Sequence, residues 1–582
     1  MLQHTFPLPD RAIVTATTGF QQACLYIVRE FEGHVNRVYN EQTSTAMGLE
    51  TSQVLASLQF GRVDAETDQR FDHCFIGTDM LRHVLQPQHS LLIGAKGSGK
   101  SAIFRLLCDD LAKLRPLLPK DVEEVFSIPV YGLQSEEYIG GTDLRELNPT
   151  TVDDFRYFWL LYLGLKAVTR LTKDPRITQL VEKKPAAKQQ FDTLLKIAGE
   201  LGLSHEDNPA STLKHKLGSW IKPAQTQGSS DPQEMSKLFA QSFQQRTGMS
   251  AIALLDTIDR MLREINSLAW MMLDKLDLLF IGDNARLRTA ITALVQLLVE
   301  YSNRFRNIHF KVFLRTDIYH HLRIVNKSHL VSYTTEMKWR GPLLMKLLVS
   351  RAVTDPLVRS FCEEKIGEPV DVTNVIVGTD EYVQKIFYVI FDPSIGRGRK
   401  SEDPPNTHEW ILSRLVDGMG YTFPREIVHL GNLAVERQRE MDRNAGKHTS
   451  PYLITAEAIQ DAFANVSSYR CDTYLYSEFP ELSKHFDVFR GSDSPTFHRQ
   501  ELYMLFEPLS PKGDEAIRAV YHAGLLIPLG RNVDASQRFR VPLLYKSGLG
   551  ITERRKRSRP SKAHPGLIPA QINSEVSWAV QG

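Results

Sequence analysis

The sequence predicts an α/β fold with a parallel sheet, followed by a helical lid and a C-terminal winged-helix domain. Three observations support this prediction. Short apolar runs alternate with helical patterns between residues 91 and 315, which is typical of parallel strands joined by helices. A glycine-rich segment, 94–101, follows the first apolar run and opens a helical pattern. After residue 450, short helical patterns, among them 478–489 and 497–506, precede two strand-like segments, 525–529 and 539–542, as in a winged helix-turn-helix.

The glycine-rich segment reads G-A-K-G-S-G-K-S and matches the phosphate-binding loop G-x-x-x-x-G-K-[ST]. Its glycines let backbone N–H groups close around phosphates, and the following helix N-terminus adds positive potential. We expect Lys100 to reach the β- and γ-phosphates and Ser101 to bind Mg²⁺. The predicted binding residues are Gly94, Ala95, Lys96, Gly97, Ser98, Gly99, Lys100, Ser101 and Ala102.

Length and composition indicate a soluble protein of several domains. The 582 residues exceed what one core holds, so roughly three to five domains are expected. The net charge of +2 means that any affinity for nucleic acid or membranes must come from local patches. The five cysteines are scattered without a C-x-x-C pair, so we expect neither disulfides nor a zinc site. The longest apolar stretch is far shorter than the ~20 residues of a membrane span, and we expect a cytoplasmic protein without membrane contact.

Changes in composition divide the chain into five parts. Proline and glycine residues between short amphipathic segments mark residues 172–248 as an insertion. The expected parts are an N-terminal helical arm (1–55), an α/β core (56–335) with an insertion (172–248), a helical lid (336–448), a winged-helix-like domain (449–550) and a basic, disordered tail (551–582).

Two segments could supply the acidic partner of a bound metal, because each ends an apolar run in Asp-x-x-Asp. The first, 252–259, continues into residues whose apolar positions fit one helical face, which predicts a helix. The second, 268–277, is compact and follows the turn signal Asn266-Ser267, which predicts a strand. A phosphate-binding loop needs an acidic partner for its metal, and we expect this partner to be Asp274 rather than Asp256.

Polar residues follow the next predicted strand, 307–314. Arg315, Thr316 and Asp317 stand at its C-terminal end, where side chains of an open α/β sheet point into the ligand crevice. The alternative is a simple turn in which Asp317 caps the next helix.

Arg425 lies in the first turn of a predicted helix, where acidic residues are usually preferred. Thr422 is the predicted N-cap of a helix, because a proline and a glutamate follow it in what would be the first turn. Arg425 in that turn opposes the dipole preference for acids. This placement indicates that Arg425 is held for a contact outside its helix.

Four motifs stand in order along the chain: the glycine-rich loop, L-D-K-L-D (273–277), F-L-R-T-D (313–317) and F-P-R-E (423–426). With the predicted winged helix, they resemble the bacterial AAA+-like ATPases near the STAND, KAP and origin-recognition groups. The chain is similar in particular to a family of bacterial P-loop ATPases marked by F-G-x-x-x-A-E (here 60–66), K-G-S-G-K-S-A (96–102) and F-L-R-x-D. The resemblance covers about residues 55–550.

The resemblance implies ATP and Mg²⁺ as ligands, with the metal held by Ser101 and Asp274. Arg315 or Thr316 would sense the γ-phosphate, and Arg425 would reach it from the lid. Relatives often carry a second acid directly after the first, whereas here Lys275 follows Asp274. The orientation of the attacking water is therefore assigned to Asp277.

The sequence thus predicts an ATP-binding and ATP-hydrolysing switch that forms homo-oligomers and regulates or scaffolds a protein effector, as relatives do in bacterial antiphage defence. One alternative is a DNA-loading ATPase of replication-initiator type; another is a nucleotide-locked scaffold with little turnover. The predicted third helix of the winged-helix domain, 514–522, carries two acids against one arginine, unlike a recognition helix. We expect only weak, sequence-independent nucleic-acid binding through the basic cluster 554–559.

Overall fold

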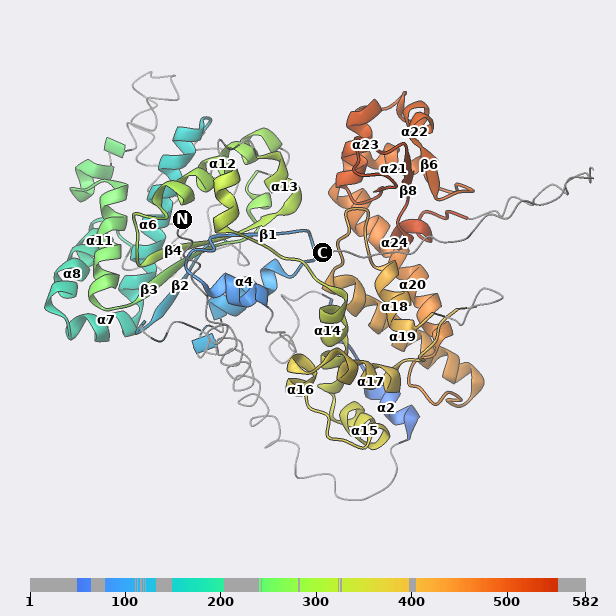
Figure 1. Cartoon of the computed structure of the whole chain (residues 1–582). Helices are drawn as coiled ribbons and strands as arrows, with labels where there is room; N and C mark the ends of the chain where they lie inside the picture. The colour runs from blue at the N-terminus through green and yellow to red at the C-terminus, as the bar shows by residue number, and fades with distance from the viewer. Residues whose placement is uncertain are drawn as a thin grey trace, which may run out of the picture.

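The computed structural model describes residues 50–63, 79–131, 149–203, 240–280, 283–396 and 405–552, with short gaps within 110–121, at 242 and within 323–326. This part of the chain is mixed α/β and mostly helical. Figure 1 shows a strand-bearing part on the left and a helical part on the right. The predictions for the arm before residue 50, the end of the F-G-x-x-x-A-E segment, the middle of the insertion and the basic tail lie outside the described residues.

Five parallel strands form one sheet in the order β2-β3-β4-β1-β5, which confirms the predicted α/β class and parallel sheet. Pro129 lies in β2 at the edge of the sheet, as proline in a strand requires. β4 lies between β1 and β3, and Gly94 of β1 is in register with Arg315 of β4. The strands are β1 Leu91–Gly94, β2 Val125–Tyr131, β3 Leu268–Leu273, β4 Ile308–Arg315 and β5 Thr334–Glu336.

Helices cover both faces of this sheet (Figure 1). Leu92 packs toward α3 and α4, whereas Leu91 and Ile93 pack into the opposite cluster, as alternation along a strand requires. Residues 175–200, part of the predicted insertion, form α7 and α8, and α8 packs on α6 and α11. The helices are α3 Asp79–Leu85, α4 Lys100–Asp109, α6 Val152–Lys173, α7 Pro175–Glu182, α8 Pro185–Glu200, α11 Ala251–Glu264, α12 Asn284–Tyr301 and α13 Thr316–His321.

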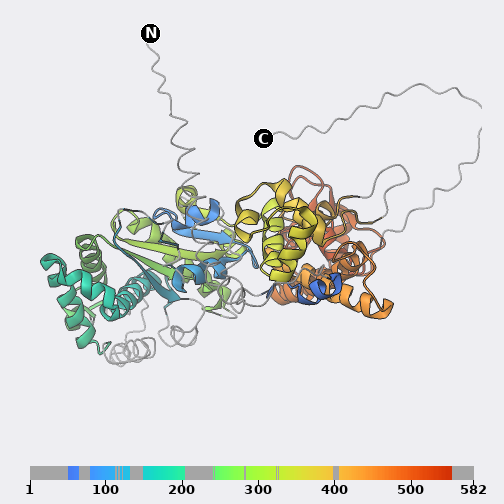
Figure 2. The same cartoon turned by 90° about the horizontal axis from the view of Figure 1, so that it is seen from below.

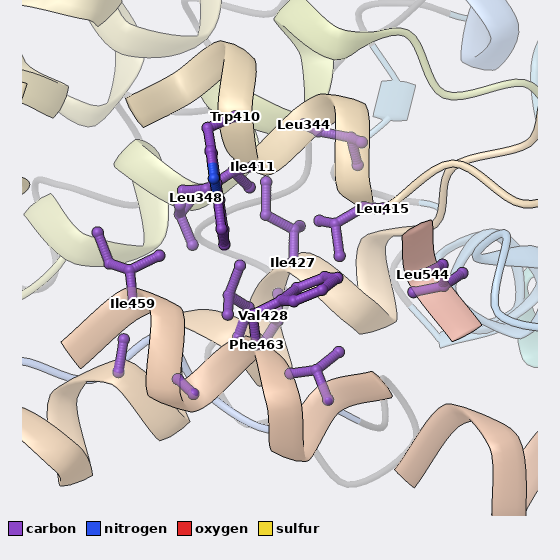
Figure 3. Packing of buried hydrophobic residues seen from close by; sticks show 14 of the residues in the cluster. Leu344, Leu348, Trp410, Ile411, Leu415, Ile427, Val428, Ile459, Phe463 and Leu544 are labelled. Carbon is purple, nitrogen blue, oxygen red and sulfur yellow. The ribbon is translucent and has the colours of Figure 1, made fainter. Parts of the chain in front are cut away.

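The helical part has its own apolar core, separate from the faces of the sheet. Figure 3 shows Trp410 of α18, Leu344 of α14, Ile427 of α19 and Phe463 of α20 in one cluster. Viewed from below, this part lies beside the sheet and not over it (Figure 2). Its helices are α14 Gly341–Val353, α15 Pro356–Ile366, α16 Val372–Val377, α17 Asp380–Ile390, α18 Thr407–Arg414 and α19 Pro424–Ala445.

The chain before the sheet is anchored in this helical part. Helix α2, Thr51–Ser57, packs against α15 and α19. Arg351 of α14 donates a hydrogen bond to the carbonyl oxygen of Phe60 at 2.7 Å. A Cβ on Gly431 of α19 would lie 2.6 Å from the Phe60 ring, so glycine is needed for this close approach. The start of α19 differs from prediction: Phe423 is the N-cap, and the Thr422 hydroxyl donates instead to the carbonyl oxygen of Trp339.

The C-terminal described region, 456–552, combines short helices with a three-stranded antiparallel sheet, β6-β8-β7. Two details differ from prediction. Phe497 was expected to begin a helix but lies in β6, paired with Phe539. Residues 478–489 were expected to form one helix but form η7 and α21, because Pro480 lacks the N–H that a continuous helix needs. The elements are α20 Ala456–Arg470, the π-helical η6 Cys471–Tyr476, η7 Pro480–Leu482, α21 Ser483–Asp487, β6 Thr496–His498, α22 Arg499–Phe506, α23 Gly513–His522, β7 Ile527–Pro528, β8 Arg538–Arg540 and α24 Leu543–Lys546.

Among the helices described in this chain, none has both the length and the apolar character needed to cross a membrane.

Candidate functional site

The glycine-rich loop joins the end of β1 to the start of α4. Gly97 and Gly99 have φ values of 88° and 92°, a backbone conformation that favours glycine. A Cβ on Gly94 would lie 2.3 Å from the Ser98 hydroxyl oxygen. The glycine spacing therefore fixes the path of this loop as it enters α4.

The Lys100 side chain is hydrogen-bonded to the backbone of its own loop. Its Nζ donates hydrogen bonds to the carbonyl oxygens of Gly94 at 2.9 Å and Ala95 at 3.0 Å. Burial lowers the pKa of Lys100 to about 8, although Asp274 opposes this effect. An anion entering the loop would replace the two bonds to neutral carbonyl oxygens with an ion pair, in which both the donor and the acceptor are charged.

Asp274 follows the last residue of β3 and contacts the first turn of α4. The Ser101 hydroxyl donates a hydrogen bond to Asp274 Oδ2 at 2.8 Å. The Asp274 residue is 2 % exposed, and burial raises its pKa despite the opposing effects of Ser101 and Lys100. The predicted secondary structure of the two acidic segments is confirmed, because 268–273 is a strand and Asp256 lies on helix α11.

A serine hydroxyl and a carboxylate in contact suit Mg²⁺, which prefers oxygen ligands. No group of three His, Cys, Asp or Glu side chains that could hold a metal ion occurs among the residues that the structure describes. A Mg²⁺ ion at Ser101 and Asp274 would therefore need phosphate oxygens and water to complete its coordination, which is how Mg²⁺ usually binds. Asp256 is instead paired with Arg304, whose guanidinium donates to it at 2.9 and 2.6 Å.

Arg315 lies at the end of β4 between three carboxylates. Its guanidinium donates two hydrogen bonds to Asp317, at 3.1 and 2.9 Å, and its Nη1 lies 3.4 Å from Asp277. Nη1 also donates to Glu478 of the C-terminal region. Burial alone would lower the pKa of Arg315, but Asp317 and the other two carboxylates raise it above its usual value.

Two predicted residues beside Arg315 make fewer polar contacts. Thr316 begins α13 and is buried, and its hydroxyl has no hydrogen-bond partner among the described residues. Asp277 lies in the 3₁₀ turn η4, Leu276–Leu278, which follows Lys275. Lys275 has a left-handed φ of 54°, and such strained non-glycine residues cluster at functional sites.

Arg425 approaches the loop from α19. A Cβ on Gly97 would lie 3.7 Å from the Arg425 Cβ, and in the described structure the Arg425 guanidinium has no hydrogen-bond partner. Arg425 and Lys96 line a small pocket together with the buried Arg470. The Trp339 indole N–H also donates to the carbonyl oxygen of Ser98 at 2.8 Å. The helical part thus contacts the loop directly.

Glu478 is a site residue that the sequence did not reveal. One of its carboxylate oxygens accepts from Lys96 of the loop, and the other accepts from Arg315. The Arg315 partner is 163 residues away in the sequence, and a single glutamate in a predicted helix carries no local signal for such a contact.

The structure therefore brings the predicted residues around one loop: Lys100 is bonded within the loop, Ser101 contacts Asp274, Arg315 and Asp277 lie at the neighbouring strand ends, and Arg425 lies beside Gly97. No protein-family model matches the sequence, and no curated protein matches it significantly.

Proposed function

We propose that this chain binds ATP at the loop 94–101 and hydrolyses it as a molecular switch. One observation carries the proposal: the Lys100 side chain is hydrogen-bonded within the glycine-rich loop, and the serine next to it is hydrogen-bonded to a buried aspartate at the end of β3. A glycine turn that only connects β1 to α4 would not need a lysine and a buried aspartate close together, because ionisable groups are costly to desolvate.

The chain's own residues would act mainly by positioning charge, which is most of what phosphoryl transfer requires. The α4 N-terminus and Lys100 would hold the β- and γ-phosphates. Ser101 and Asp274 would hold Mg²⁺, which neutralises charge on the phosphate oxygens. Asp277 would orient a water, and Arg315 lies at a neighbouring strand end where it could stabilise charge on the terminal phosphate.

In this proposal residues 336–448 act as a lid beside an AAA+-like core, and 449–550 form a winged-helix-like domain. The contacts of Trp339 and Arg425 with the loop support the first assignment, and the short helices with an antiparallel β6-β8-β7 sheet support the second. Assembly with further copies or with a protein effector, including a role in antiphage defence, belongs to the proposal through the resemblance alone.

The helix α23 does not favour the DNA-loading alternative. Its Arg518 is paired with Asp534 at 2.7 Å, and its Asp514 is paired with Arg499. These side chains are engaged within the domain, whereas a recognition helix presents basic or amide groups to DNA.

Equilibrium binding of ATP with Mg²⁺, measured by calorimetry, tests the proposal. The wild-type chain should bind ATP, and Lys100→Ala should bind it at least about 10-fold more weakly, since bonds to charged groups contribute roughly 1.5–3 kcal/mol each. Lys196→Ala is the matched control, because Lys196 is 75 % exposed on α8, outside the loop. A folded Lys100→Ala protein that binds ATP like the control would contradict the proposal.

A further inference from the structure

We propose that Glu478 is an acidic latch, which holds Lys96 of the phosphate-binding loop and Arg315 of β4 when no nucleotide is bound and is displaced by the terminal phosphate of a bound nucleoside triphosphate. This inference rests on the proposed function. It goes beyond that function by assigning a regulatory contact between the C-terminal region and the site.

The geometry of Glu478 is that of a bridging anion. Its Oε1 is paired with Lys96 of the loop, and its Oε2 is paired with Arg315 at the end of β4. The Glu478 and Arg315 side chains are only 14 % and 16 % exposed. The two carboxylate oxygens thus satisfy two converging cations in a place that is largely shielded from solvent.

Glu478 is paired with cations that lie where a phosphate bound in the loop would contact them. Lys96 belongs to the loop itself, and Arg315 is in register with Gly94 at the start of the loop. Asp317 already occupies Nε and Nη2 of Arg315, so Nη1 is the nitrogen that faces Glu478 and Asp277. A phosphate oxygen and the Glu478 carboxylate would compete for these donors, because two like charges brought close together repel. Binding of the triphosphate and closure of the latch are therefore in competition.

Glu478 belongs to the C-terminal region 456–552, so its displacement would affect how this region is held. Glu478 follows η6, the π-helical end of α20, and π-helical turns are rare and frequent at functional sites. Helix α20 is fixed to α19 by the buried ion pair of Arg470 with Glu426 at 2.7 Å. Loss of the two Glu478 ion pairs would remove a tie between 456–552 and the strand-bearing part. Coupling between two sites is reciprocal. A nucleotide that displaces Glu478 therefore also loosens residues 456–552, and a partner that holds these residues in place weakens nucleotide binding.

A neutral variant, Glu478→Gln, tests the latch against the matched control Glu481→Gln, which removes an exposed carboxylate three residues away. Binding of ATP and ADP, each with Mg²⁺, is measured by calorimetry on the full chain. Glu478→Gln should bind ATP at least tenfold more tightly than the wild type, with a smaller gain for ADP because ADP lacks the terminal phosphate. Glu481→Gln should match the wild type for both nucleotides.

Hydrogen exchange on the wild-type chain gives a second readout that does not depend on a variant. Addition of ATP should increase amide exchange in residues 471–487, and ADP should change it less. Equal ATP affinity for Glu478→Gln and the wild type, equal gains for ATP and ADP, or unchanged exchange on ATP addition would overturn the latch. If neither the wild type nor the variants bind ATP, the proposed function fails and the latch fails with it.

Discussion

Replacement of Asp274 by asparagine should abolish the effect of Mg²⁺ while leaving the fold intact or more stable. Asparagine has nearly the same shape and keeps an oxygen that can accept the hydrogen bond from Ser101. What it removes is one negative charge. Because burial raises the pKa of Asp274, the charged form is disfavoured in the nucleotide-free protein, and loss of the charge should not lower the melting temperature.

The expected functional loss is large by comparison. Removal of one oxyanion-hole donor from an enzyme costs ~10²–10³ in turnover, or ~2.7–4 kcal/mol, and we expect a loss of this order for Asp274→Asn. Asp256→Asn is the matched control, since it removes the same charge from the partly exposed pair with Arg304. Such pairs contribute about 0–1 kcal/mol to stability, so this variant should lose little stability and no activity.

The assay measures ATP hydrolysis and ATP affinity with and without Mg²⁺ for both variants, together with thermal unfolding without nucleotide. Asp274→Asn should lose the Mg²⁺ dependence of both quantities without a fall in melting temperature. Unchanged Mg²⁺-dependent hydrolysis in Asp274→Asn, or its loss in Asp256→Asn, would refute the assignment of the metal residue.

Three further outcomes follow from the described contacts. Arg425→Ala should weaken ATP binding about tenfold and ADP binding less, because Arg425 approaches the loop from the lid; an equal loss for both nucleotides would make its role structural. Arg470→Ala should destabilise the helical part by about 3–5 kcal/mol, since it leaves Glu426 buried without its partner, and denaturant unfolding that matches the wild type would contradict this. Burial lowers the pKa of Lys311 to about 7 from an ordinary 10.5, so the unfolded chain binds more protons between these values. Stability relative to Lys311→Met should therefore rise with pH across that window, by at most about 1.4 kcal/mol per pH unit, and parallel melting-temperature profiles would contradict it.

Local patterns were sufficient to predict the strand-bearing half of the site. The glycine spacing of residues 94–101 is sufficient to predict the turn between β1 and α4. The apolar run before Asp274 is short and compact, as in a strand, whereas the apolar positions around Asp256 continue along one helical face. Arg425 stood out because it opposes the helix dipole, and the structure places it beside Gly97.

The remaining contacts depend on residues far apart in the chain. Glu478 meets Lys96 only because α20 and η6 reach the end of the sheet. The close approach of Phe60 to Gly431 likewise joins segments that no periodicity connects. The Phe497 strand was missed because three residues of β6 lead directly into α22, and a short strand at a helix start shares the apolar spacing of the helix.

A structure of the full chain with a non-hydrolysable ATP analogue and Mg²⁺ would test the central claim most directly. It should show the phosphates within the loop 94–101, the metal between Ser101 and Asp274, and Glu478 displaced from Lys96 and Arg315. Phosphates bound elsewhere, or a loop without nucleotide at saturating analogue, would contradict the assignment of this chain as an ATP-dependent switch.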